Sequence, residues 1–143
     1  MDYATAEFIC WLDVTQTLEE IIDFVKALTW EHEVEVAVLR VRGHGLAVVS
    51  GGKIGIELGI EVGEPYDLFG NPSRWATVRT GAGICRVDQL VLHTHPMPTG
   101  PSDWDRNLLS LLGQSESWIY EIGDPHGTRF TPKPLVDDEG DDQ

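Results

Sequence analysis

The fold is decided by one stretch, Val87-Asp-Gln-Leu-Val-Leu-His-Thr-His-Pro-Met-Pro-Thr-Gly-Pro-Ser-Asp-Trp-Asp-Arg-Asn-Leu-Leu-Ser-Leu-Leu112. Its first part contains Val87 and the apolar run Leu90-Val-Leu92 and stops at a proline after His95, which predicts a strand. From Ser102 the apolar residues follow helical spacing, and Gly113 is a common helix stop. The stretch therefore predicts a strand, a tight loop rich in proline and glycine, and a helix.

The chain around this stretch predicts more strands and a second helix. Apolar residues from Leu18 to Leu28 repeat at helical spacing, and Thr15 or Thr17 can cap the helix. Runs of β-branched residues broken by glycines predict strands and hairpins. The elements are a helix over 17–28, strands over 33–41 and 46–49 in a hairpin, a third strand over 54–62, a long loop over 63–74, a short strand over 75–79, and strands over 117–122 and 128–131 in a second hairpin. This order predicts an α+β domain built on one mixed sheet.

Length and composition set the size and the setting of the domain. The chain has 143 residues, of which 41% are hydrophobic, so we expect one domain over 1–135 and an acidic, unstructured tail over 136–143. Cys10 and Cys85 lie in apolar stretches, where a thiol usually behaves as a small hydrophobic residue, although one disulfide between them stays open. There is no apolar run of membrane-spanning length and no basic leader, so a cytoplasmic protein is expected.

The charge of the chain limits its partners. Lys and Arg number 10 against 24 Asp and Glu, which gives a net charge of -14. Such a surface repels phosphate backbones and anionic membranes, so we expect neither nucleic acid nor membrane as a partner. A partner with a basic surface would be attracted.

His93 and His95 are candidate metal ligands in this same stretch. Residues two apart in a strand point to the same face, so the two imidazoles can converge on one ion. The loop leads into a helix whose first turn holds Asp105. Two imidazole nitrogens and one carboxylate suit zinc, and three protein ligands leave the fourth position for water, as in catalytic zinc sites. An ordinary helix start gives the same Ser-x-x-Asp pattern, so Ser102 is also expected as an N-cap.

The same residues resemble the zinc motif of the JAMM (MPN-plus) metalloproteases, which reads His-x-His-Pro, a short loop and then Ser-x-x-Asp. The likeness runs from about Thr17 to Thr131. One departure is the loop: nine residues separate His95 from Asp105, where the family usually has ten. The resemblance implies an MPN or JAB fold, a mixed curved sheet flanked by helices with the layering of cytidine deaminases. It also implies zinc on His93, His95 and Asp105, and a role for Ser102 in stabilising the oxyanion.

The family's general base is a glutamate at the start of the first long strand, and this chain has two candidates. Glu33 and Glu35 both follow the first predicted helix and share one strand face by parity. We favour Glu33, because it matches the family spacing better when counted back from the Gly43–Gly45 turn. Glu35 stays open as the alternative.

The resemblance predicts a zinc-dependent peptidase or isopeptidase that hydrolyses an amide or isopeptide bond at the C-terminus of a ubiquitin-like protein, as a deubiquitinase does. Insertions before the zinc motif often contact the modifier in this family, so we expect Tyr66 and Phe69 in the 63–74 loop to bind substrate. Two alternatives remain: a catalytically silent JAMM-like scaffold, and a RadC-like or toxin-associated domain with another substrate.

Overall fold

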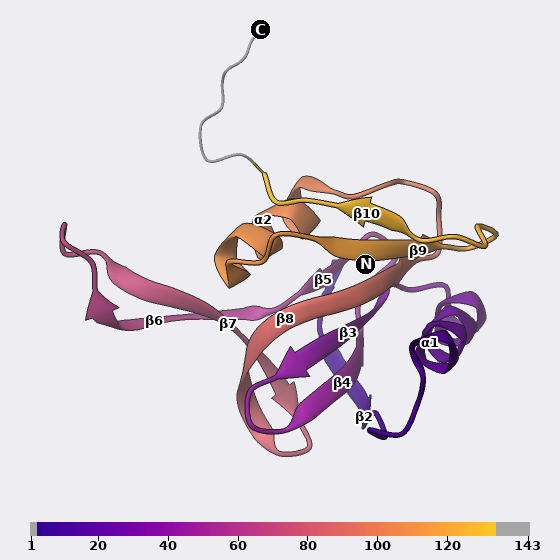
Figure 1. Cartoon of the computed structure of the whole chain (residues 1–143), viewed down its shortest axis with the longest axis horizontal. Helices are drawn as coiled ribbons and strands as arrows, with labels where there is room; N and C mark the ends of the chain where they lie inside the picture. Colours follow the sequence, from indigo (N-terminus) through magenta and orange to yellow (C-terminus); the bar gives the residue numbers. More distant parts are fainter. Residues whose placement is uncertain (1–2, 134–143) are drawn as a thin grey trace, which may run out of the picture.

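The computed structural model describes residues 3–133 (Figure 1), so the predicted tail over 136–143 lies outside the described residues. The described part of the chain forms two helices and ten strands. In order they are β1 Tyr3–Thr5, β2 Glu7–Trp11, α1 Leu18–His32, β3 Val36–Val41, β4 Gly45–Ser50, β5 Gly55–Glu57, β6 Gly59–Tyr66, β7 Pro72–Thr80, β8 Gly83–His95, α2 Asp103–Leu112, β9 Ser117–Glu121 and β10 Thr128–Phe130.

Strand β8 organises the main sheet, whose central order is β10-β9-β8-β3-β4-β2. One edge of β8 pairs antiparallel with β3. The other edge pairs antiparallel with β7 near its start and parallel with β9 at its end. In the part of β8 between its pairings with β7 and β9, the backbone of Leu90 is hydrogen-bonded to the side-chain amide of Gln114. This amide accepts from Leu90 N–H at 2.9 Å and donates to Leu90 C=O at 2.7 Å. The predicted α+β class with a mixed sheet flanked by helices is confirmed.

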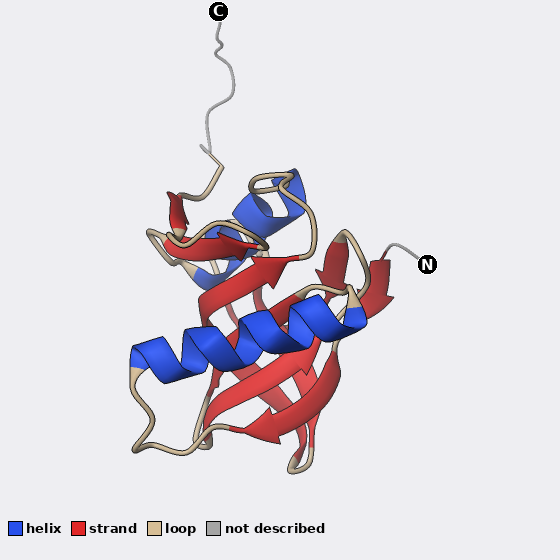
Figure 2. Cartoon of the chain, turned by 90° about the vertical axis from the view of Figure 1, so that its right-hand side faces the viewer, coloured by secondary structure: helices blue, strands red, loops and turns tan. Residues whose placement is uncertain are grey.

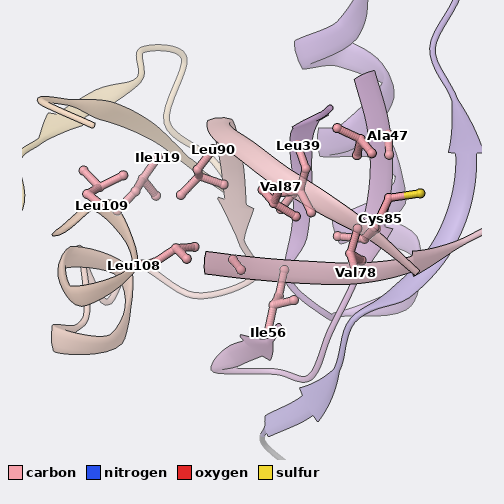
Figure 3. Packing of buried hydrophobic residues seen from close by; sticks show 14 of the residues in the cluster. Leu39, Ala47, Ile56, Val78, Cys85, Val87, Leu90, Leu108, Leu109 and Ile119 are labelled. Atoms are coloured by element: carbon pink, nitrogen blue, oxygen red, sulfur yellow. The ribbon is translucent and has the colours of Figure 1, made fainter. Parts of the chain in front are cut away.

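The two faces of the sheet carry separate cores, as the alternation of side chains along a strand requires. Helix α1 lies across one face (Figure 2), where it packs on Val36, Val38 and Leu92. The opposite face holds the larger core, which includes Leu39, Val87, Leu90 and residues of α2 (Figure 3). Successive residues of β3 therefore point alternately toward α1 and toward α2.

The boundary between α1 and β3 differs from the prediction. The helix does not end at 28 but runs to His32, with Thr17 as its N-cap. Glu33 is the C-cap, in the left-handed conformation with φ 56°, and so it does not begin the strand. The ladder of β3 starts at Val36, preceded by two backbone hydrogen bonds of Glu35 with Gly51 and Gly52.

The region expected as a long loop over 63–74 is mostly paired strand. Strands β6 and β7 form a hairpin that projects from the rest of the molecule (Figure 1). The segment without strand structure between them is limited to the turn over 67–71. The strand expected over 54–62 is divided into β5 and the start of β6 at Leu58. Strands β1 and β2 were not predicted. We define β6, β7 and their turn, residues 59–80, as the arm.

The remaining predicted elements are confirmed. Hairpin β3–β4, strand β8, helix α2 with Gly113 as its C-cap, and hairpin β9–β10 occupy the expected regions. Cys10 and Cys85 are both free thiols, so no disulfide joins them. Within residues 3–133, neither helix is long and apolar enough to cross a membrane.

Candidate metal centre

Strand register brings three of the site residues onto one face of the sheet. His93 is paired with Ala37, and Thr94 with Val36, in the antiparallel ladder of β3 and β8. Continuing this ladder by one residue sets Glu35 opposite His95. Ala37 belongs to the core on the α2 side, so His93, His95 and Glu35 point toward α2.

Thr94, between the two histidines, points the other way and holds the strand to α1. Its hydroxyl lies against that of Thr29 and donates to the carbonyl oxygen of Val36 at 3.2 Å. Both threonines are fully buried. The His-Thr-His segment is therefore held by Thr94 on the face toward α1, while its two imidazoles lie on the opposite face.

The loop after β8 and the start of α2 supply the fourth side chain. Ser102 and Asp105 form a capping box: Asp105 N–H donates to Ser102 Oγ, and Ser102 N–H donates to Asp105 Oδ2, each at 3.0 Å. This box fixes the carboxylate of Asp105 on the side of the helix that faces β8. An ordinary helix start thus also positions a candidate ligand.

The four side chains converge in a buried cluster. Asp105 Oδ2 lies 3.3 Å from His93 Nε2 and 3.5 Å from His95 Nε2, and Glu35 Oε2 lies 3.4 Å from His95 Nε2. One candidate ligand atom from each residue lies within 4.8 Å of all the others. All four residues are 7% exposed or less. The cluster can hold a metal ion.

Unpartnered nitrogen atoms support this assignment. His93 Nδ1, His93 Nε2 and His95 Nε2 are buried and have no hydrogen-bond partner among the described residues. Buried polar atoms are normally satisfied. Ligands at about 2.0–2.2 Å from a tetrahedral ion stand about 3.3–3.6 Å apart. The separations of Asp105 from both imidazoles and of Glu35 from His95 fall in that range, which is the spacing expected of ligands that share one ion.

The charges of the cluster are strongly coupled. Burial, reinforced by the nearby Asp105, raises the pKa of Glu35 to about 8, although His95 opposes this. Burial also acts to raise the pKa of Asp105, but the two imidazoles beside it outweigh burial and hold that pKa well below its usual range. Burial lowers the pKa of His95, yet the neighbouring carboxylates of Asp105, Glu35 and Glu121 raise it above its ordinary value.

A small cavity adjoins the cluster. It measures about 20 Å³ and is lined by Glu35, His93, Asp105 and Trp104 together with apolar side chains. A volume of about 10–15 Å³ of this kind is enough for one water molecule. Trp104 is held in place because its indole N–H donates to the carbonyl oxygen of Ile56 at 2.7 Å.

The two glutamates that the sequence left open are in different surroundings. Glu35 belongs to the cluster, whereas Glu33 is exposed at the end of α1. The placement of Glu33 at the first position of the strand was wrong, because the left-handed cap turns the chain before the ladder begins. Parity alone could not separate the two residues, since both are an even number of positions from Ala37.

The other predicted residues are less close to the cluster. Ser102 touches it through Asp105. Tyr66 ends β6 and Phe69 lies in the turn of the arm; they are 59% and 88% exposed, and neither belongs to the cluster.

Two polar residues beside His95 were not predicted: Thr99 in the loop and Glu121 at the end of β9. Thr99 Oγ1 lies 3.2 Å from His95 Nδ1, and Glu121 Oε2 lies 4.0 Å from the same atom. A strand–helix–strand order after His95 allows a parallel crossover, which brings the ends of both strands to one edge. That order was present in the sequence and could have identified Glu121.

Comparisons with known proteins identify no relative. The chain matches no family model, no curated protein and no solved structure.

Proposed function

We propose that the chain is a zinc-dependent hydrolase of the JAMM type, with an MPN-like fold, in which His93, His95 and Asp105 hold the metal. The observation that carries this proposal is the buried cluster with its unpartnered imidazole nitrogens. Two imidazoles and one or two carboxylates form a donor set that zinc accepts. The resemblance of the His-x-His-Pro and Ser-x-x-Asp motifs to the JAMM pattern supports the same reading.

In this proposal Glu35 is the general base and acid, in place of Glu33. When bound, zinc supplies a Lewis acid that polarises the scissile carbonyl and lowers the pKa of water. Hydrolysis also needs a group that takes a proton from water and returns it to the leaving nitrogen. Glu35 is buried beside both His95 and the small cavity, so its carboxyl group is in position to exchange a proton with a water molecule there.

A groove between the arm and α2 is the proposed substrate-binding site. It measures about 430 Å³, and its lining includes Ile60 and Arg74 of the arm. Leu58, Trp104 and Leu108 line both this groove and the small cavity beside the cluster. An extended chain end lying in the groove would therefore be led toward the metal. The proposed substrate is the C-terminal segment of a ubiquitin-like protein, and its basic side chains would be favoured by the net charge of -14.

A second function is favoured by one observation. Glu35 Oε2 is as close to His95 Nε2 as Asp105 Oδ2 is, so Glu35 can also complete a closed site of four protein ligands. Closed zinc sites are structural. The domain would then be a catalytically silent, metal-stabilised scaffold.

The test is hydrolysis of a ubiquitin-like protein fused at its C-terminus to a reporter. We expect the zinc-loaded protein to release the reporter, a chelator to stop release, and added zinc to restore it. His95→Ala should be inactive under all three conditions. A zinc-loaded, folded protein without activity on a panel of such fusions would contradict the hydrolase and favour the scaffold.

A further inference from the structure

The loop between the two histidines and α2 is fastened to strand β9. Parallel pairing sets His95 beside Glu121. The side chain of Glu121 accepts a hydrogen bond from Gly100 N–H at 2.7 Å. On the backbone, Ile122 N–H donates to the carbonyl oxygen of His95 at 3.2 Å. Strand β9 therefore contacts both ends of the segment from His95 to Gly100.

Thr99 contacts the nitrogen of His95 that is turned away from the cluster. Nδ1 lies 3.2 Å from Thr99 Oγ1 and on the same side as the carboxylate of Glu121, whereas Nε2 faces Glu35 and Asp105. A histidine that binds a metal through one nitrogen commonly donates its other N–H to an oxygen, which fixes the ring and its tautomer. With the proton on Nδ1, Nε2 has a free lone pair directed at the metal position.

Glu121 also acts on the third ligand through the loop. Gly100 stands two residues before Ser102, whose N–H holds the carboxylate of Asp105. Gly100 has φ 70°, a conformation that other residues rarely adopt, so the loop depends on this position. Without the bond from Gly100 to Glu121, the path from β8 to α2 would lose its only side-chain anchor on β9 among the described residues.

From these contacts we infer that Thr99 and Glu121 are positioning residues of the metal centre: Thr99 orients His95, and Glu121 holds the loop that leads to Asp105. This inference rests on the proposed metal site. Neither residue contacts the metal position, so each acts through a ligand.

The first test is zinc affinity, measured by competition with a chromophoric chelator. Loss of an outer partner of a metal-binding histidine typically costs about 10–100-fold in affinity. We expect losses of that size for Thr99→Val and for Glu121→Ala. Thr99→Ser keeps the hydroxyl, and Glu121→Gln keeps an oxygen for Gly100 N–H, so both should stay closer to the wild type. Glu116→Ala is the matched control, because Glu116 lies just before β9 and, within residues 3–133, its side chain pairs only with exposed Arg129.

Wild-type affinity in both Thr99→Val and Glu121→Ala would overturn the inference. A measurement on the metal-free protein keeps it testable if the wild type binds no zinc. NMR at a pH above the pKa of His95 should show His95 protonated on Nδ1, faster amide exchange at Gly100 in Glu121→Ala, and a mixture of His95 tautomers in Thr99→Val. These results without zinc binding would remove the proposed function but leave the positioning roles; unchanged exchange and tautomer would remove the positioning roles.

Discussion

Glu35 and His95 face each other across the paired strands β3 and β8, with Glu35 Oε2 3.4 Å from His95 Nε2. The two residues come from segments 60 positions apart in the sequence and meet because the ladder of Val36 with Thr94 continues one step further. This contact joins a carboxyl group of raised pKa to a candidate metal ligand, and it places Glu35 in the cluster.

Glu35→Gln should show whether Glu35 is the general base or a fourth metal ligand. It keeps the size of the side chain but removes its basicity, so we expect zinc to be retained and turnover of a ubiquitin-like fusion to fall by roughly a hundredfold or more. Glu33→Gln is the matched control and should change neither. If Glu35→Gln loses zinc as completely as His93→Ala, Glu35 is a ligand of a closed site. If Glu33→Gln alone loses turnover, Glu33 is the base after all.

The metal-free protein should lose stability as pH rises. The pKa of Glu35 is raised in the folded state from 4.5 to about 8. The stability that the protein has with this carboxyl group protonated is therefore fully present below pH 4.5 and is lost as pH rises toward 8. The raised pKa of His95 acts in the same direction. We expect the melting temperature to fall over this interval, and Glu35→Gln to flatten the fall. A pH profile that the substitution leaves unchanged would show that ionisation of Glu35 does not destabilise the folded protein.

Ser102→Ala should show whether Ser102 is more than a cap. Loss of the cap costs about 1 kcal/mol of stability. Loss of an oxyanion donor costs roughly a hundredfold in turnover. The matched control is Thr17→Ala, which removes the same kind of capping box from α1, far from the cluster in sequence. Both variants should melt earlier, but only Ser102→Ala should lose turnover in the folded enzyme. Equal turnover in the two variants would reduce Ser102 to a cap.

The arm offers a test of substrate binding. Tyr66 and Phe69 are largely exposed, so replacing both by Ala should leave the melting temperature nearly unchanged. If they bind substrate, KM should rise more than kcat falls, because binding common to the ground state and the transition state is lost. Ile84→Ala, at an exposed position at the start of β8, is the control. Unchanged kinetics in the double variant would assign substrate binding to the groove at the base of the arm alone.

Much of the site could be predicted because its signals are local. His93 and His95 share a strand face by parity, and the Ser102 and Asp105 pattern starts a helix whether or not a metal binds. The choice between Glu33 and Glu35 depends on where α1 ends. Helices commonly end at a glycine in the left-handed conformation, but here Glu33 adopts it without any sequence signal. Glu121 meets His95 through the parallel pairing of β8 and β9, which the order of elements allows but does not fix, and Thr99 meets it through the path of the loop, which no sequence pattern predicts.

The arm escaped prediction for a different reason. Residues 63–74 contain the glycines, prolines and asparagine that are typical of loops. Pairing of β6 with β7 overrides this composition, and glycine suits position 63 because an added Cβ would lie 3.1 Å from the ring of Trp75. Cross-strand contacts of this kind are not visible in the sequence of either strand alone.

The most direct test of the metal centre is the metal content of the purified protein, measured by mass spectrometry after exchange into zinc and removal of the unbound ion. We predict about one zinc per chain, a sharp loss in His93→Ala and in His95→Ala, and no loss in His126→Ala, where the histidine is exposed and outside the cluster. Stoichiometric zinc that persists in the folded His93→Ala/His95→Ala double variant, or a folded wild type that binds no zinc, would contradict the metal centre.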